Sequence, residues 1–137
     1  MKKIDKTLDT IHSILIRLIN TDENGIGYCY TCNDRLTFHT AQCGHYPKIP
    51  RGNMQFRWNL VIHKIQCESC NCFKDGLAEP FRDMLVFEFG HNKVSRYEIN
   101  SKKPFKWFKF DKQQLLKEYR VKCRELMQDK NFEIQIP

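Results

Sequence analysis

Four cysteines in two identical pairs are the residues whose spacing most directly indicates chemistry. Cys29 and Cys32 form one Cys-x-x-Cys pair, and Cys67 and Cys70 form the other. Two residues between cysteines let both thiolates of a tight turn reach one ion, and two such turns complete a tetrahedral shell of four sulfurs. We therefore predict a structural Zn²⁺ site that leaves no position for a substrate. Buried free thiols or a redox pair are the alternatives.

The other three cysteines fit such a site less well. Cys72 is close enough in sequence to compete with Cys70, but Cys70 has the better spacing. Cys43 and Cys123 stand apart from both pairs and are interpreted as buried thiols.

The N-terminal sequence MKKIDKTLDT begins with basic residues but reaches Asp5 and Asp9 before any apolar block, unlike a signal peptide. No apolar run approaches the roughly 18 residues that a membrane span needs. We therefore expect a cytoplasmic protein with no membrane association. In that reducing compartment cysteines bind metal or lie buried rather than form disulfides.

The elements that must position these residues follow from length and hydrophobic pattern. The 137 residues support a single domain, which we divide into an N-terminal helix (1–27), a zinc-clamped core (28–76) and a helical, basic C-terminal extension (77–137). Apolar residues spaced by three and four predict an amphipathic helix over 4–20; they are Ile4, Leu8, Ile11, Leu15 and Leu18. We expect this stripe to pack on the rest of the domain, with a dimer interface as the alternative.

The remaining pattern predicts an α+β fold. Turns and short strands are expected over 28–72, and a helix from about Ser69 to Gly76. Pro80 suits the first turn of a further helix that ends before Gly90. Its predicted buried residues are Phe81, Met84, Leu85 and Phe89. Asp111 with Gln114 resembles a capping box for a last helix that runs to about Gln128.

The positive charge of the chain is concentrated near its C-terminal end. Residues 100–124 contain nine basic and two acidic side chains, and the difference equals the net charge of +7 of the whole chain. Between Lys102 and Lys112 the lysines alternate with Phe105, Trp107, Phe108 and Phe110. Lysines neutralise phosphates and aromatic rings stack on unpaired bases, so the segment fits DNA. A solvated helix face next to a core strand is the alternative.

The residues between and after the cysteine pairs resemble a known family. The matching segments are Cys29-x-x-Cys32, Gly44-His45-Tyr46, Arg57-Trp58-Asn59, Gln66 to Asn71, and Gly76. Together they resemble the NinG/Rap family of phage recombination nucleases, which act on branched DNA. That family belongs with the zinc-bearing HNH, or ββα-metal, endonucleases, as does the endonuclease VII type of Holliday-junction resolvase. The resemblance is densest over 28–90 and covers most of the chain.

The resemblance implies a division of roles between a β-hairpin and the helix after it. It maps His45 onto a general base for the attacking water, and Asn71 onto a ligand of one catalytic Mg²⁺ or Mn²⁺ at the scissile phosphate. A neutral imidazole can accept a proton near pH 7, so the chemistry is consistent. The alternatives are a hydrogen-bonded hairpin histidine and a helix-capping asparagine.

One position departs from the wider HNH pattern. Many HNH nucleases carry an acidic metal ligand directly before the base histidine, whereas this chain has Gly44, as the NinG-like pattern also does. The second protein ligand of the catalytic metal is then unassigned. His63 is the best candidate, because it precedes the second cysteine pair on the expected return strand, ahead of His39 and Asp75. A surface or core histidine is the alternative for His63. Arg57 could approach the phosphate, as arginines do in phosphoryl transfer, with solvated charge as the alternative.

Other charged residues carry weaker signals. Lys48, Arg51 and Lys74 could line the path of DNA, with solvated surface charge as the alternative for each. His12 and His91 have no motif around them.

The resemblance implies a DNA endonuclease that cleaves Holliday junctions or D-loops, and a resolvase of this kind is expected to act as a homodimer. Two alternatives are an HNH nuclease that cuts DNA without branches and a non-catalytic zinc module that binds DNA. Gly44 is the main support for the second alternative.

Overall fold

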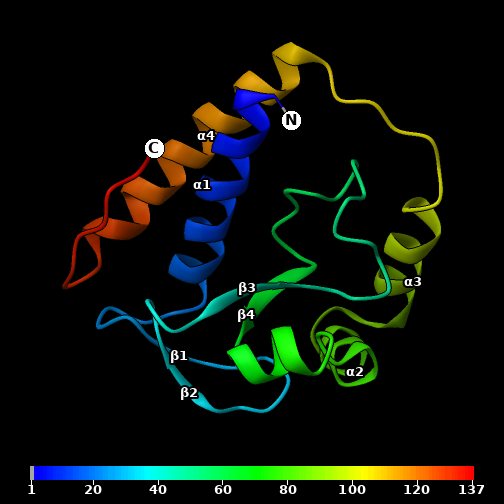
Figure 1. Cartoon of the computed structure of the whole chain (residues 1–137), viewed down its shortest axis with the longest axis horizontal. Helices are drawn as coiled ribbons and strands as arrows, with labels where there is room; N and C mark the ends of the chain where they lie inside the picture. The colour runs from blue at the N-terminus through cyan, green and yellow to red at the C-terminus, as the bar shows by residue number, and fades with distance from the viewer. Residues whose placement is uncertain (1) are drawn as a thin grey trace.

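The computed structural model describes residues 2–137, and Figure 1 shows helices around two small antiparallel sheets. Within these residues the helices are α1 (Lys3–Ile19), α2 (Ala78–Phe89), α3 (His91–Asn100) and α4 (Lys109–Gln128), with a π-helical turn, η1 (Ser69–Phe73). The strands β1 (Ile26–Tyr28) and β2 (Arg35–Thr37) form one sheet, and β3 (Gln42–His45) and β4 (His63–Gln66) form the other. The predicted α+β class is therefore confirmed.

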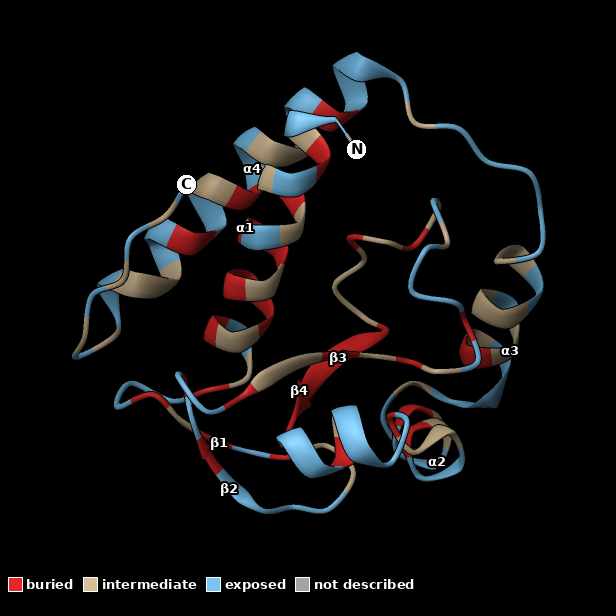
Figure 2. Cartoon of the chain, in the orientation of Figure 1, coloured by how far each residue is buried: buried red, intermediate tan, exposed pale blue. Residues whose placement is uncertain are grey.

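The first and last helices lie side by side in Figure 1, with α1 in blue and α4 in orange. The predicted apolar stripe of α1 faces inward, because Leu8, Ile11, Leu15 and Leu18 are fully buried (Figure 2). Tyr119 and Cys123 of α4 belong to the same apolar cluster, as do Phe38 and Trp58. Each buried leucine or isoleucine contributes on the order of 2 kcal/mol. Since the stripe packs within the chain, it does not provide the dimer interface that was its alternative interpretation.

The last helix begins earlier than the capping-box pattern predicts. It starts at Lys109, and its N-cap residue, Phe108, makes no side-chain cap. Asp111 instead lies in the first turn, where a carboxylate complements the helix dipole. The predicted end at Gln128 is confirmed. No helix within residues 2–137 is both long enough and apolar enough to cross a membrane.

The strands β3 and β4 are joined by a long connection, residues 46–62, rather than by a tight turn. Their register pairs Gln42 with Gln66 and His45 with His63. The connection is packed rather than free, since four of its residues form an apolar cluster with α2 and α3: Tyr46, Ile49, Phe56 and Ile62. In α2, Phe81 and Leu85 are buried as predicted, whereas Met84 is 40% exposed, so that part of the prediction is wrong.

The expected helix from Ser69 is a single π-helical turn, followed by a sharp change of direction into α2. Asp75, Gly76 and Leu77 all have positive φ angles, of 52°, 81° and 54°. A Cβ atom at position 76 would lie 2.8 Å from Pro47 Cγ. Gly76 is therefore required both by its backbone conformation and by the close approach of Pro47.

Candidate functional site

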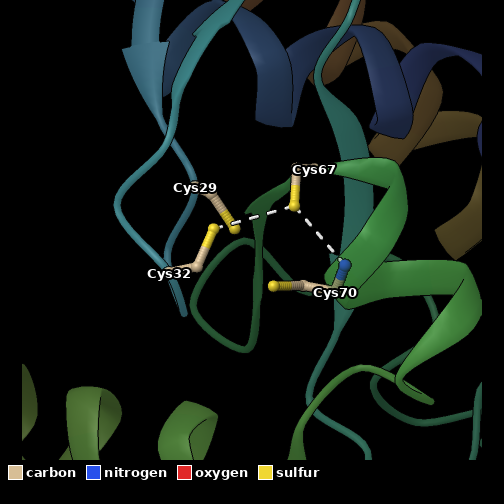
Figure 3. Close-up of side chains that lie close together, drawn as sticks. All are labelled: Cys29, Cys32, Cys67 and Cys70. Carbon is tan, nitrogen blue, oxygen red and sulfur yellow. Dashed lines mark hydrogen bonds between the residues drawn. The ribbon is translucent and has the colours of Figure 1, made fainter.

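The four predicted zinc cysteines come together. The Sγ atoms of Cys29, Cys32, Cys67 and Cys70 all lie within 4.8 Å of one another. Figure 3 shows the first pair, from the turn after β1, facing the second pair, from the segment after β4. The Cys32 and Cys67 Sγ atoms are 3.7 Å apart. A tetrahedral site with zinc–sulfur bonds of about 2.3 Å has sulfur–sulfur edges of about 3.8 Å, so the cluster fits one such ion.

Hydrogen bonds tie the cysteine cluster to the β3–β4 pair. The Tyr30 N–H, between the first two cysteines, donates to the Ile65 carbonyl of β4 at 3.0 Å. Within the cluster the Cys70 N–H donates to Cys67 Sγ at 3.4 Å. Cys72 lies outside the group, is exposed, and donates to Gln42 Oε1 at 3.1 Å. The cluster therefore includes Cys70 rather than Cys72, as the spacing predicts. An ion in the cluster would hold the start of β2 against the end of β4.

A pocket of about 700 Å³ is lined by α1, β3, the 46–62 connection, β4 and η1. Three residues singled out in the sequence line it: Arg57, His63 and Asn71. His45 is half-buried and does not appear among the described lining residues, but it lies directly opposite His63 in the β3–β4 pair. Directly opposite residues of an antiparallel pair share one face of the sheet. His39 and Asp75, the weaker ligand candidates, are exposed and lie outside the pocket lining.

The tautomer of His63 follows from a shared acceptor. The Asn59 carbonyl oxygen lies 2.8 Å from His63 Nδ1 and 2.9 Å from His12 Nε2. A carbonyl oxygen only accepts hydrogen bonds, so both of these nitrogens carry protons. The Nε2 atom of neutral His63 is then a bare lone pair, which suits a metal ligand or proton acceptor. The His12 and His63 rings meet edge-on, with centroids 4.5 Å apart.

Burial keeps the three histidines of this region neutral at pH 7. Burial, with a smaller contribution from the positive charge of Arg51, lowers the pKa of His45 to about 4. Burial also lowers the pKa of His12 to about 4, against the opposing effects of the Asn59 carbonyl and Asp9. The pKa of His63 lies well below its ordinary value for the same first reason, with His12 adding to the effect. Neutral imidazoles can bind metal or accept a proton.

The Nδ1 atom of His45 is buried and has no hydrogen-bond partner within residues 2–137. The hydrogen-bonded hairpin histidine considered from the sequence would have a partner at this atom. Buried polar atoms without partners are uncommon and call for an explanation.

Asn71 lies in the middle of η1, and its Nδ2 donates to Gln42 Oε1 of β3 at 2.8 Å. The N-cap position of η1 is Glu68, so Asn71 does not cap that turn as the alternative interpretation supposed. Its amide instead links η1 to β3 at the edge of the pocket.

Arg57 is held by an acidic residue of α1. Its Nε and Nη2 atoms lie 2.9 Å and 2.6 Å from the two carboxylate oxygens of Asp9, and Trp58 Nε1 donates to the same carboxylate at 2.8 Å. The hydrogen bonds that Arg57 donates to Asp9 raise the pKa of Arg57. The pair leaves Arg57 in the pocket wall with its charge balanced.

The small residue before His45 is explained by its neighbour on β4. A Cβ atom at Gly44 would overlap Gln66 Oε1. Gln66 is fully buried, and its Nε2 donates to the Gly76 carbonyl at 2.9 Å and to Thr31 Oγ1 at 3.0 Å. Gln66 thus fills the space that an acidic side chain at position 44 would need, and it connects the cysteine turn to the segment after η1.

One wall of the pocket was missed in the sequence. Helix α1 contributes Asp9, His12, Ser13 and Arg17 to the lining. These residues are spaced by three, one and four, so they form a polar stripe beside the apolar one. That spacing was a usable signal, but the sequence does not show what the stripe faces.

Comparison with known proteins gives one match. The family model of the bacteriophage lambda NinG protein matches residues 1–130. A search of curated proteins and a search of solved structures each found no match. The family match spans nearly the whole chain and includes both cysteine pairs and the pocket. The chain therefore belongs to the NinG family, which is related to phage recombination.

Proposed function

We propose that this protein is a zinc-stabilised, Mg²⁺- or Mn²⁺-dependent endodeoxyribonuclease of the ββα-metal, HNH-like type. Its substrates would be branched recombination intermediates such as Holliday junctions and D-loops, in the cytoplasm of a phage-infected bacterium. The observation that carries the proposal is the order β3, β4, η1, with His45 on the first strand and Asn71 directly after the last cysteine of the cluster. This order matches the hairpin and helix of a ββα-metal unit.

The residues fit hydrolysis of a phosphodiester. His45 is neutral at pH 7, so it can take the proton of the attacking water, and its half-buried position limits competing solvent. Asn71 would hold the divalent cation, with His63 as the second ligand. When bound, the cation would neutralise negative charge on the phosphate and on the leaving oxygen. The hydrogen bond of Asn71 to Gln42 and that of His63 to Asn59 fix the orientation of both side chains. The cysteine cluster fixes the spacing of strand and turn.

The segment between α3 and α4 supports DNA as the partner. Residues 101–108 form an irregular connection that arches away from the core in Figure 1. Lys102, Lys103, Lys106 and Lys109 are all exposed there. Phe105, Phe108 and Phe110 are 44%, 63% and 67% exposed. The core strand considered from the sequence is absent from this part of residues 2–137, so lysines and rings are both available to a nucleic acid.

Trp107 anchors this segment. Its Nε1 donates to the Met54 carbonyl at 2.6 Å, and its ring lies 5.4 Å from that of Trp58 between centroids. The anchor ties the basic segment to the connection that forms the pocket wall. A strand bound along the segment would therefore be directed toward the pocket.

The proposal is tested by cleavage of a labelled four-way junction beside linear duplex and single-stranded controls, in Mg²⁺ and then in Mn²⁺. Replacing His45 by Ala should lower the cleavage rate by about 100-fold or more while DNA binding survives. His39→Ala is the matched control, because His39 is exposed and lies outside the pocket lining. Equal cutting of all substrates would remove branch specificity and leave an HNH nuclease. Binding without cutting in either metal would favour a non-catalytic zinc module.

A homodimer is part of the proposal, because two sites are needed to cut opposed strands of a junction. The exposed face of the long helix α4 is the helical surface that we assign to this interface. Sedimentation of the zinc-loaded chain with and without junction DNA would test it, and a monomer in both conditions would contradict it.

A further inference from the structure

The pocket has an excess of positive charge that the proposed chemistry does not use. Among its described lining residues are three arginines, Arg17, Arg51 and Arg57, and one acid, Asp9. The bidentate pair of Arg57 with Asp9 cancels one charge of each sign. The histidines of the region are neutral at pH 7. Arg17 and Arg51 therefore leave two positive charges around the pocket.

Arg17 presents a fixed guanidinium from α1. Its Nε donates to the Ser13 carbonyl at 3.2 Å and its Nη1 to the Phe38 carbonyl at 3.4 Å. The guanidinium lies over the Phe38 ring, 4.5 Å from its centroid. A guanidinium carries five N–H groups, so three of them donate to no acceptor within residues 2–137. The stacking holds the plane of the group while these donors stay available.

Arg51 lines the same pocket from a different segment, the 46–62 connection. It is exposed and forms no ion pair within the described part of the chain. Its positive charge lies close enough to His45 and His63 to lower the pKa of both groups. Burial raises the pKa of Cys43 to about 12, and the positive charge of Arg51 opposes this rise.

We infer that Arg17 and Arg51 form a phosphodiester-binding site across this pocket, between α1 and the 46–62 connection, while Arg57 and Asp9 build its wall. Guanidinium groups pair with the oxygens of a phosphodiester through parallel hydrogen bonds. A pocket of about 700 Å³ holds a nucleotide unit rather than a duplex. This inference rests on the proposed function only in taking DNA as the source of the phosphodiester. It moves the phosphate contact from Arg57, the residue chosen from the sequence, to Arg51 and Arg17.

The test uses dimethyl phosphate, the smallest phosphodiester, with the zinc-loaded full chain. Titration is followed by the NMR signals of the arginine side-chain Nε–H groups. The signals of Arg17 and Arg51 should shift together, and Arg51→Gln should weaken the apparent affinity by about fivefold or more. Arg17→Lys, which keeps the charge but loses the fork, should also weaken it. Arg35→Gln is the matched control, because Arg35 is an exposed arginine of β2 outside the pocket.

The outcomes separate this inference from the nuclease proposal. Unchanged titration in Arg51→Gln would overturn the inference, even if the protein cuts junctions. Shifts confined to Arg57 would also overturn it and return the phosphate to that residue. Binding that depends on Arg51, in a protein that cuts no DNA, would support the inference and remove the nuclease.

Discussion

The cysteine cluster and the pocket beside it were assembled in different ways. The cluster takes its four sulfurs from two short turns, each with a fixed internal spacing. The pocket takes its lining from α1, β3, the 46–62 connection, β4 and η1. A site built from two local motifs can be recognised in a sequence, because each motif already sets half of its geometry. A site built from five segments exists only after the segments pack.

The largest expected effect is the loss of structure around the cysteine cluster when it holds no zinc. Removing the ion from the cysteine cluster with a chelator, or replacing Cys70 by Ser, should unfold β1 to β4 and the segment up to Gly76. Zinc binding to such sites is worth about 10–16 kcal/mol, which exceeds the stability of most small domains. Amide hydrogen exchange should show loss of protection there first, with α1 and α4 retaining more.

Cys72→Ser is the control for this prediction, since Cys72 is exposed and lies outside the cluster. Full protection after chelation would show that the cluster does not need an ion.

The buried His12 of the pocket should make the free energy of unfolding depend on pH. The pKa of His12 is about 4 in the folded chain against an ordinary value of 6.5. Between these values the unfolded state binds more protons, so the free energy of unfolding falls as the pH drops from about 6.5 to 4 and is flat above. The shift corresponds to on the order of 3 kcal/mol. Urea unfolding at a series of pH values would measure it.

His12→Gln keeps a donor for Asn59 but cannot titrate. Acid also releases metal from the cysteines in both proteins, so the difference between the two pH profiles isolates His12. Parallel profiles would contradict the prediction.

The third prediction addresses the packing that joins the two regions. Gly44→Ala should cost about 2 kcal/mol, because its Cβ would overlap Gln66 Oε1 on the neighbouring strand. In the double variant with Gln66→Ala the two costs should not add, and the coupling should be about 1 kcal/mol or more. Chemical denaturation of the four proteins gives the cycle. If the two losses of stability add, Gln66 can move aside without cost. The glycine at position 44 would then need another explanation.

The smallest effect is expected in the basic segment, which contributes no residue to either site. Replacing Lys102, Lys103, Lys106 and Lys109 by Gln should weaken DNA binding and reduce the slope of its salt dependence by about 0.9 for each phosphate that is no longer neutralised. Fluorescence anisotropy at several salt concentrations measures the slope. Lys117 and Lys122 on α4 are exposed lysines outside the segment and serve as the control pair. An equal change in the salt slope per lysine in both sets would show that the lysines of the segment act only as ordinary surface charges.

Several elements could be predicted because their causes are local. The stripe of Leu8, Ile11 and Leu15 predicts α1, since spacings of three and four place those side chains on one face of a helix. Gly90 marks the end of α2 for a similarly local reason, with a φ angle of 87°. The start of α4 lies three residues before the predicted one, with Phe108 rather than Asp111 at the N-cap, because Asp111 suits both a cap and a first turn.

The role expected for Arg57 shows the limit of the sequence. Its place beside Trp58 and Asn59 favours a contact with DNA. In the folded chain its guanidinium instead binds Asp9, which is 48 residues away in the sequence. His12 lacked any motif, yet it shares the Asn59 carbonyl with His63.

The sequence by itself determined the cysteine cluster, the class of fold and the family. Ligand spacing, helical periodicity and a specific run of motifs are properties of neighbouring residues. Only the tertiary structure decided which polar face of α1 closes the pocket, why position 44 is glycine, and which pocket arginine pairs with an acid. Those answers depend on interactions between residues far apart in the chain, such as Asp9 with Arg57 and His12 with Asn59. Packing creates such interactions, and it depends on all the elements at once.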